Sequence, residues 1–280
     1  MTLPTDLGLS SSALPLLRDL VHERLGLFYD PGRFDALADR LAPLVVDAGF
    51  TSFLDYFYLL KYDPQAPREW LRVMDALSVT ETYFWREIDQ LRAIVDVVVP
   101  ALLHERPGAP LRIWSVPCAT GEEPLTIAML LEEAGLFARG TIEIHASDAS
   151  PAALEKARAG RFRERSFRSL PPHLRLKYFQ RDGDTWVMAP ALHARVTSWS
   201  TVNLRCEGDV AAHARVPIIF CRNVFIYFSP DAVRRVVEQF ARAMPSPGYL
   251  CVGAAESLLK IATQFELEEV GGAFVYVKRG

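Results

Sequence analysis

Apolar side chains recur at intervals of three and four through the first 76 residues, the spacing of one face of a helix. Leu17, Leu20, Val21 and Leu25 follow this spacing, and later stretches such as FDALADRLAPLVV repeat it. The periodicity predicts successive amphipathic helices. We therefore expect an all-helical N-terminal domain over residues 1–76.

From about residue 110 the pattern changes to short apolar runs separated by helical stretches. The runs are LRIWSV, TIEIHASD, VPIIFC and GYLCVGA. Strand alternating with helix indicates a parallel sheet with helices on both faces. The last two runs, FELEEV and AFVYVKRG, are joined by Gly271 and Gly272 and predict a hairpin. A final antiparallel strand fits a Rossmann-like class I methyltransferase sheet better than a dehydrogenase, so residues 77–280 are expected to form an α/β domain of that class.

Between about residues 163 and 198 the alternation lapses. This stretch contains a PP break, a DGD turn and a short WVM run. It predicts a small β-subdomain inserted into the α/β domain. Such insertions on a rigid sheet often carry recognition.

Composition and motif spacing do not favour nucleic-acid binding, metal binding, secretion or a membrane span. The chain has 280 residues and a net charge of −3, so charge gives no indication of a nucleic-acid binder. Its four cysteines form no CxxC pair, and no histidine cluster has metal-ligand spacing, so we expect free thiols and no metal site. The N-terminus does not resemble a signal peptide, and no apolar run has the length of a membrane span. We therefore expect a cytoplasmic protein.

Acidic residues follow the first two strands, at the edge of the sheet where ligands bind. Glu122 and Glu123 come after the first strand, and Asp148 ends the second, where dinucleotide folds place the acid that binds ribose hydroxyls. A phosphate would be repelled by two adjacent glutamates. The pattern favours a ligand with a ribose and a cationic group, such as S-adenosylmethionine. Either glutamate alone could instead be a helix-start carboxylate, Glu123 more readily than Glu122.

The segment VTETYFWRE lies at the junction of the two predicted domains. We expect Thr80, Thr82 and Arg86 to lie on neighbouring turns at the start of one helix. Arg86 could pair bidentately with the methionyl carboxylate of the ligand. The alternative is an ordinary capped helix whose arginine pairs with Glu87.

These motifs together resemble the CheR family of chemotaxis receptor methyltransferases. The resemblance rests on VTETYFWRE, RIWSVPCATGEEPLTIAMLL, ASDASPAALEKARAGRF and IIFCRNVFIYFSPDAVRRVVEQFARAMPSPGYLCVGAAESL, and it covers nearly the whole chain. It implies S-adenosylmethionine as cofactor, S-adenosylhomocysteine as product, and methyl esterification of receptor glutamates in the signal transduction of sensory adaptation. The leading helical region matches the small N-terminal domain of the family.

The resemblance also implies cofactor-binding residues in the linker and at the strand ends. They are Thr80, Thr82, Arg86, Glu122, Asp148, Asn203, Leu204, Arg222 and Asn223. The family usually has asparagine where Thr80 stands, and threonine lacks the amide. No catalytic base is expected, because a glutamate acceptor is already anionic at neutral pH.

The implied partner is the cytoplasmic helical domain of a receptor, bound by a monomeric enzyme. A basic run over residues 156–177 could steer an acidic helix, although such a run is more often a solvated face. Its cations are Lys156, Arg158, Arg161, Arg163, Arg165, Arg168, Arg175 and Lys177. The hairpin near DGDTW is tighter than in family members that hold a receptor tether, which favours a tether-independent enzyme. The alternatives are a non-catalytic cofactor-binding scaffold and a methyltransferase with a non-receptor substrate.

Overall fold

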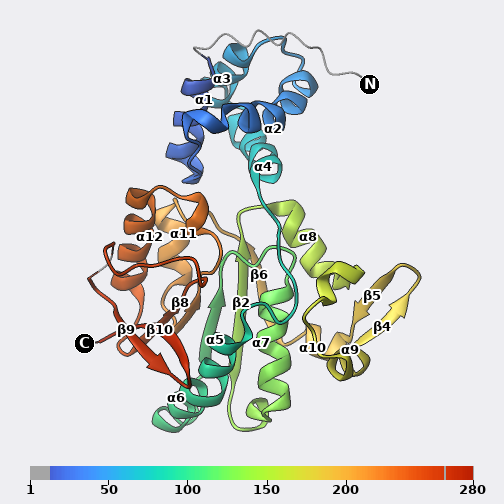
Figure 1. Ribbon diagram of the computed structural model, residues 1–280, viewed down its shortest axis with the longest axis vertical. Coiled ribbons are helices and arrows are strands. Elements are labelled where there is room, and N and C mark those ends of the chain that lie inside the picture. Colours follow the sequence, from blue (N-terminus) through green and yellow to red (C-terminus); the bar gives the residue numbers. More distant parts are fainter. Residues whose placement is uncertain (1–12, 262, 280) are drawn as a thin grey trace. The chain divides into compact units, whose positions relative to one another are not determined.

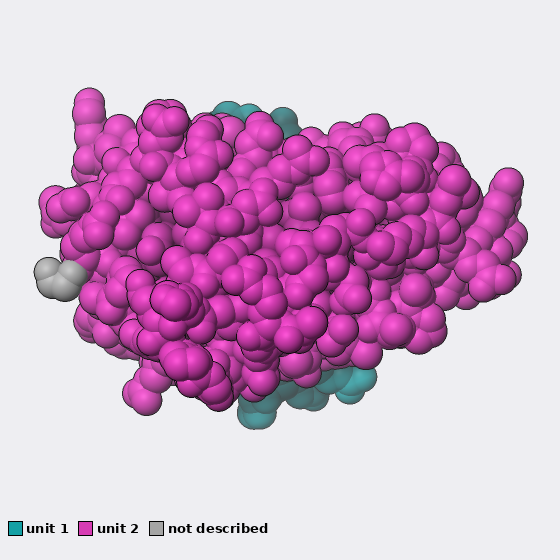
Figure 2. All heavy atoms as spheres, turned by 90° about the horizontal axis from the view of Figure 1, so that it is seen from below, with its two compact units in different colours: residues 1–79, 227–232 teal, residues 80–226, 233–280 magenta. Residues whose placement is uncertain are grey.

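The computed structural model describes residues 13–261 and 263–279 (Figure 1). The first twelve residues of the expected N-terminal domain therefore lie outside the described part. The chain divides into two compact units, coloured separately in Figure 2. One contains the chain up to residue 79 together with residues 227–232, and the other contains residues 80–226 and 233–280.

The first unit is built from the helices that the apolar periodicity predicts. They are α1 (Ala13–Leu25), α2 (Phe34–Asp47), α3 (Phe53–Tyr62) and α4 (Ala66–Leu77). Leu17, Val21, Leu37 and Leu41 are fully buried between them. Tyr56 is buried as well. The hydroxyl of a buried tyrosine needs a hydrogen-bond partner, which a neighbouring residue can provide. Within residues 13–79 the expected helices are confirmed, and Leu27 adds an isolated antiparallel β-bridge to Phe228.

A seven-stranded sheet forms the centre of the second unit, in the order β6-β2-β1-β7-β8-β10-β9. Its strands are β1 (Leu111–Ser115), β2 (Ile142–Asp148), β6 (Val196–Thr201), β7 (Ile218–Phe220), β8 (Gly248–Cys251), β9 (Glu266–Val270) and β10 (Ala273–Lys278). The first five pair in parallel, and β10 runs antiparallel to β8 and β9. The Rossmann-like class I methyltransferase sheet and its final hairpin are thus confirmed.

Both faces of this sheet are covered. Successive side chains of a strand point to opposite faces, and Ile218, Ile219 and Phe220 of β7 are all fully buried. The flanking helical elements are α5 (Ile88–Ala93), a π-helical turn (Ile94–Val98), α6 (Val99–Glu105), α7 (Glu122–Glu133), α8 (Pro151–Ala159), α11 (Glu207–His213) and α12 (Pro230–Ala243). Two-sided burial explains why these strands appear in the sequence as continuous apolar runs.

The inserted β-subdomain is also present. A three-stranded antiparallel sheet contains β3 (Arg161–Phe162), β5 (Thr185–Met188) and β4 (Phe179–Asp182), in that order. It is accompanied by a 3₁₀ helix (Glu164–Phe167), α9 (Pro172–Tyr178) and α10 (Pro190–His193).

An aromatic cluster joins the linker to this subdomain. The ring of Phe84 is fully buried and lies 4.8 Å from Phe162, 5.0 Å from Phe179 and 5.5 Å from Phe167, measured between ring centroids. These edge and stacked arrangements are the favourable ones for aromatic rings. The backbone N–H of Phe84 also donates to the carbonyl of Ser166 at 2.9 Å. The chain that enters the α/β domain is therefore held against the insertion.

Replacing Phe84 by alanine should lower the free energy of unfolding by about 3–5 kcal/mol, the range for deleting a buried phenylalanine ring. Urea denaturation followed by tryptophan fluorescence would measure the change. Phe274→Ala is the matched control, because that ring on β10 is 63% exposed, and its effect should stay within about 0.5 kcal/mol. Equal losses in the two variants would contradict the proposed anchoring of the linker.

Candidate active site

The strand order reverses beside β1, which has β2 on one side and β7 on the other. In open α/β sheets ligands bind at such a switch point, outside the carboxyl ends of the strands. The loops that follow β1, β2, β7 and β8 contain residues 116–121, 149–150, 221–224 and 252–256. Four of the nine residues implied as cofactor contacts, Glu122, Asp148, Arg222 and Asn223, lie in or next to these loops.

The loop after β1 requires its single glycine. Gly121 has a φ of 98°, a left-handed conformation that favours glycine. A Cβ atom at this position would lie 3.1 Å from both the Ala157 side chain and the Trp199 ring. Ala119 in the same loop also has a positive φ of 47°. The left-handed conformation of Gly121 and the close packing around it together explain why the turn that leads into α7 requires glycine.

Asp148 ties the first two loops together. Its carboxylate accepts the backbone N–H of Ala119 at 2.8 Å and that of Ser150 at 2.8 Å. The residue is only 7% exposed. The side chain at the end of β2 thereby fixes the conformation of the loop after β1.

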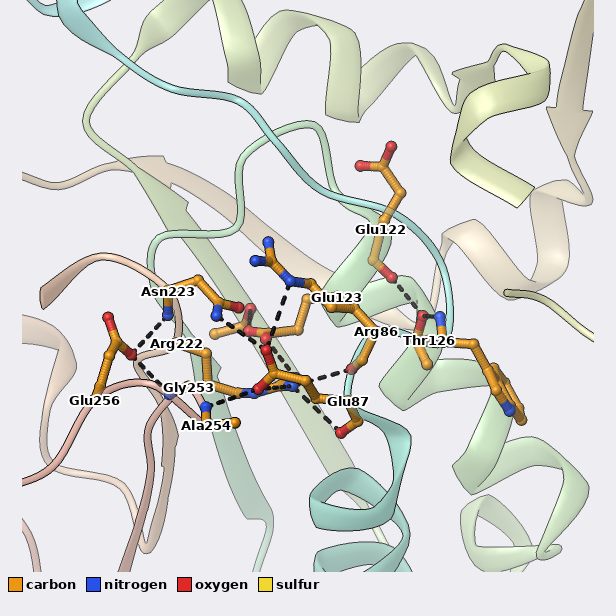
Figure 3. A network of polar contacts seen from close by, with 12 residues as sticks. Arg86, Glu87, Glu122, Glu123, Thr126, Arg222, Asn223, Gly253, Ala254 and Glu256 are labelled. Atoms are coloured by element: carbon orange, nitrogen blue, oxygen red, sulfur yellow. Dashed lines mark hydrogen bonds and ion pairs between the residues drawn. The ribbon is translucent and has the colours of Figure 1, made fainter. Parts of the chain in front are cut away.

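Glu122 is buried on the first turn of α7. It is 2% exposed, and it accepts hydrogen bonds from the hydroxyls of Thr120 at 2.6 Å and Ser166 at 2.9 Å. Burial raises the pKa of Glu122, and the two hydroxyl hydrogen bonds offset part of that effect. Ser166 comes from the inserted subdomain, and nothing in the sequence signalled this contact. Figure 3 shows Glu122 projecting away from the polar cluster around Arg222.

Arg222 lies at the centre of a second, buried cluster (Figure 3). Its side chain is 1% exposed, and its guanidinium is 3.0 Å from the Glu123 carboxylate and 3.2 Å from that of Glu87. It also donates to the carbonyl of Arg86 at 3.0 Å, while Ser115 donates to Glu123 at 2.7 Å. Glu123 therefore does more than begin a helix. The guanidinium that the resemblance assigns to the cofactor is engaged with protein carboxylates.

The two carboxylates around Arg222 have opposite pKa shifts. Burial raises the pKa of Glu123, against the opposing effect of the Arg222 charge and the Ser115 hydrogen bond. Burial acts in the same direction on Glu87, but the Arg222 charge and hydrogen bonds from Asn223 and Ala254 outweigh it, so the pKa of Glu87 is lowered. The more exposed partner thus holds its negative charge more readily.

Asn223 is held from several sides. Its φ is 60°, its side-chain amide donates to Glu87 at 3.1 Å, and its backbone N–H donates to Glu256 at 2.7 Å. Glu256 also accepts the N–H groups of Gly253 at 2.7 Å and Ile226 at 3.2 Å. Sequence reasoning missed Glu256, although it is the one acid in the apolar segment GYLCVGAAESLL.

The expected helix start around Thr80 and Thr82 is wrong. The chain from residue 78 to residue 83 has no helical structure, residues 84–87 form a turn, and α5 begins only at Ile88. Trp85 and Glu87 have positive φ values of 70° and 47°, which no helix allows. Thr80 and Thr82 are half-buried in the extended part.

Tertiary contacts impose the turn on this linker. The N–H of Trp85 donates to the hydroxyl of Thr126 on α7 at 3.3 Å. Arg86 donates to the carbonyl of Glu81 at 2.6 Å and lies 3.8 Å from the Glu87 carboxylate. Its side chain is 24% exposed. The linker thus runs over the start of α7 with Arg86 partly open to a ligand.

Asn203 and Leu204 follow β6, the neighbour of β2. Leu204 is buried, and Asn203 is half-buried with its side-chain oxygen accepting the N–H of Arg205 at 2.9 Å. The N–H of Val202 donates to the backbone carbonyl of Asp148 at 3.0 Å. This segment therefore adjoins the corner that contains Asp148.

The loop after β1 also contains a buried cysteine, Cys118. Burial, and then the charges of Asp148, Glu123 and Glu122, raise the pKa of Cys118 well above its usual range, so its thiol is not a ready nucleophile. No group of at least three metal-ligating acids, histidines or cysteines occurs among residues 13–261 and 263–279. No helix within these residues is both long enough and apolar enough to cross a membrane.

Nearby carboxylates neutralise part of the positive charge of the basic run. Ion pairs join Arg161 to Asp182, Arg168 to Glu81, Arg175 to Glu164 and Lys177 to Glu133. Four of the eight cations therefore have a carboxylate partner. The run is a weaker positive surface than the sequence alone indicates.

Comparisons with known proteins agree over nearly the whole chain. Residues 80–273 match the model of the CheR methyltransferase S-adenosylmethionine-binding domain, and residues 12–78 match that of the CheR all-alpha domain. Chemotaxis protein methyltransferase 2 of Vibrio cholerae is 35% identical over 93% of this chain and 91% of that protein. Chemotaxis protein methyltransferase 1 of Pseudomonas aeruginosa is 27% identical, covering 93% and 96% respectively.

A match among solved structures is much weaker. Magnesium protoporphyrin IX methyltransferase from Synechocystis PCC 6803 aligns with a TM-score of 0.36 and 12% identity, over 96% of this chain and 98% of that one. Similarity at this level carries no weight for function.

Removing the buried guanidinium should be strongly destabilising. Arg222→Met should lower the free energy of unfolding by about 3–5 kcal/mol, because Glu87 and Glu123 would lose their counter-ion. The double variant Arg222→Met/Glu123→Gln should recover part of the loss. Arg279→Met is the matched control, since that exposed arginine pairs with Glu268 at the surface, and its effect should be below about 1 kcal/mol. Denaturant titration measures the free energy of unfolding of all three variants. An equal loss in Arg279→Met would contradict the role of Arg222 as a buried counter-ion.

The raised pKa of Glu122 predicts a pH-dependent effect of Glu122→Gln. The folded state prefers the protonated acid, so the wild type loses stability as pH rises above the usual value near 4.5. The glutamine variant should therefore melt at a higher temperature than the wild type at pH 8, and the difference should vanish towards pH 4.

Glu133→Gln should behave in the opposite way. Hydrogen bonds from Lys177 and then Tyr178 lower the pKa of Glu133, so that variant should melt below the wild type at pH 8. Thermal melting at several pH values tests both signs. A Glu122→Gln variant less stable at pH 8 than at pH 4, relative to the wild type, would be inconsistent with a buried acid of raised pKa.

Proposed function

The chain belongs to the CheR methyltransferase family, and on that premise we propose that it methylates glutamate side chains of chemotaxis receptors. S-adenosylmethionine-dependent methylation in chemotaxis follows from the family itself. The glutamate acceptor and the receptor are the finer part of the proposal. The structural observation that supports cofactor binding is the pair of buried acids, Glu122 and Asp148, beside the switch point of the sheet, and the receptor glutamate as acceptor is inferred from the resemblance of the sequence motifs to the family.

These residues suit the cofactor. Two buried carboxylates disfavour a phosphate and favour a ligand with a cationic end. Asp148 accepts the backbone N–H groups of Ala119 and Ser150 at the end of β2, and we propose that a ribose diol binds to the same carboxylate. The backbone of the β1 loop is pinned by the same carboxylate, which preorganises the site before the ligand arrives.

The other implied contacts are assigned by position. Arg86 is partly exposed and can pair with the methionyl carboxylate. Asn223, with its side-chain oxygen unengaged by the described residues, can accept from the adenine amino group. Thr80, Thr82, Asn203 and Leu204 complete the proposed set. Arg222 acts differently from the expectation, because we propose that it holds Glu87 and Glu123 in place.

The chemistry needs little from the protein beyond placement. The bound cofactor supplies an electrophilic methyl group on a positively charged sulfur. A glutamate side chain has a pKa near 4.3 and is already anionic at neutral pH. A new oxygen–methyl bond forms as the sulfur–methyl bond breaks, and neither product needs a proton moved. The chain's task is to align the two groups and to exclude water.

The remaining features of the proposal concern location and partners. We propose a cytoplasmic monomer whose helical and catalytic domains meet near residue 79 and not after the expected residue 76, because α4 continues to Leu77. Its substrate would be the cytoplasmic helical domain of a receptor. Because half of the basic run is paired with acids, steering by that run is expected to be modest.

Methyl transfer to receptors tests the proposal directly. Incubation with methyl-labelled S-adenosylmethionine and receptor-containing membranes should give label on the receptors that alkali releases, as expected of a carboxyl ester. Asp148→Ala should weaken S-adenosylhomocysteine binding by about 1–3 kcal/mol, the range for losing a charged acceptor. Calorimetry measures this loss.

Asp182→Ala is the control, because Asp182 lies on the exposed inserted hairpin and pairs with Arg161. It should bind S-adenosylhomocysteine like the wild type. Alkali-stable label, or label on other proteins only, would refute the receptor-glutamate assignment. Cofactor binding without any transfer would indicate a scaffold instead.

A further inference from the structure

We infer that Glu256 is a positioning residue for the cofactor site, acting through Asn223. This inference rests on the proposed function, because it concerns how the cofactor contact is held. Glu256 is 7% exposed and lies in the loop after β8. Its carboxylate faces Asn223 and Gly253 in Figure 3.

One carboxylate joins two loops at the ligand-binding edge of the sheet. Its Oε2 atom accepts the N–H groups of Asn223 and Gly253, each at 2.7 Å. Its Oε1 atom accepts the N–H of Ile226 at 3.2 Å. Charge-assisted hydrogen bonds to backbone N–H groups are stronger than neutral ones. The loop after β7 is thus fastened to the loop after β8.

The fastening controls a backbone conformation that is unfavourable by itself. Asn223 has a φ of 60°, which asparagine tolerates better than most residues but which still carries strain. The bond to Glu256 fixes the backbone of Asn223, and the bond to Glu87 fixes its side-chain amide. Together they leave the side-chain oxygen in one defined position for a ligand.

Close packing at Gly253 supports the same reading. A Cβ atom at this position would lie 2.5 Å from the side-chain nitrogen of Asn223 and 2.8 Å from the Glu256 carboxylate. Such distances force the neighbours to move. Glycine is therefore required because Asn223 is pressed against the β8 loop, not because of its own backbone conformation.

Glu256→Gln keeps the size of the side chain but replaces one acceptor oxygen by a donor. At least one of the three N–H groups must then lose its partner. The variant should bind S-adenosylhomocysteine about 5- to 150-fold more weakly by calorimetry, the range for losing a charged acceptor. At saturating cofactor its kcat should change little, while KM for S-adenosylmethionine rises.

Glu69→Gln is the matched control. Glu69 is a buried acid of the helical unit, 9% exposed, which accepts from Tyr56 at 2.7 Å and pairs with Arg72. It should lower the melting temperature without changing cofactor affinity. A merely structural role for Glu256 would give the same result in both variants.

Gly253→Ala gives an independent test if Glu256→Gln does not fold. It keeps the Glu256 side chain but crowds both that carboxylate and Asn223, and it should also weaken S-adenosylhomocysteine binding. Wild-type affinity in a folded Glu256→Gln or Gly253→Ala variant would overturn the inference. A wild-type protein that fails to bind S-adenosylhomocysteine would instead overturn the proposed function.

Discussion

A single buried guanidinium joins three distant parts of the chain. Arg222 follows β7, Glu123 lies in the first turn of α7, and Glu87 ends the linker. The guanidinium lies within 3.2 Å of both carboxylates. Charges removed from water are stable only when they are paired and hydrogen-bonded. The three segments must therefore come together for any of them to be buried. The loops at the ligand-binding edge depend on this constraint.

The acids around the first loop select what can bind there. Burial, and then the negative charges of Asp148, Glu123 and Glu122, raise the pKa of the Cys118 thiol in this loop. Glu123 is paired with Arg222, whereas Glu122 accepts from the hydroxyls of Thr120 and Ser166 and Asp148 accepts backbone N–H groups. This distribution leaves negative charge at the edge of the sheet where we propose that the cofactor binds. It distinguishes the site from phosphate-binding loops of related sheets.

Backbone strain is concentrated in the same place. Among the described residues, the non-glycine residues with positive φ are Trp85, Glu87, Ala119 and Asn223. Every one of them lies in the linker or in a loop at the ends of β1 and β7. Such conformations persist only where surrounding contacts over-determine them. Here those contacts come from Thr126, Asp148, Arg222 and Glu256.

Sequence alone determined the elements of this protein and the order of its polar strand ends. Apolar spacing distinguishes helix from strand because burial follows the period of each, and the acids after β1 and β2 were visible directly. Only the tertiary structure decided which charged side chains pair with one another. Arg222 and Glu123 are separated by 99 positions, and half of the basic run is paired with acids that no local spacing indicates. The linker was predicted to begin a helix, but residues 84–87 form a turn whose backbone bonds to Ser166, Thr126 and Arg222. Local sequence patterns indicate the secondary-structure propensity of a segment. Ion pairing and backbone strain depend instead on which segments, distant in the sequence, come into contact.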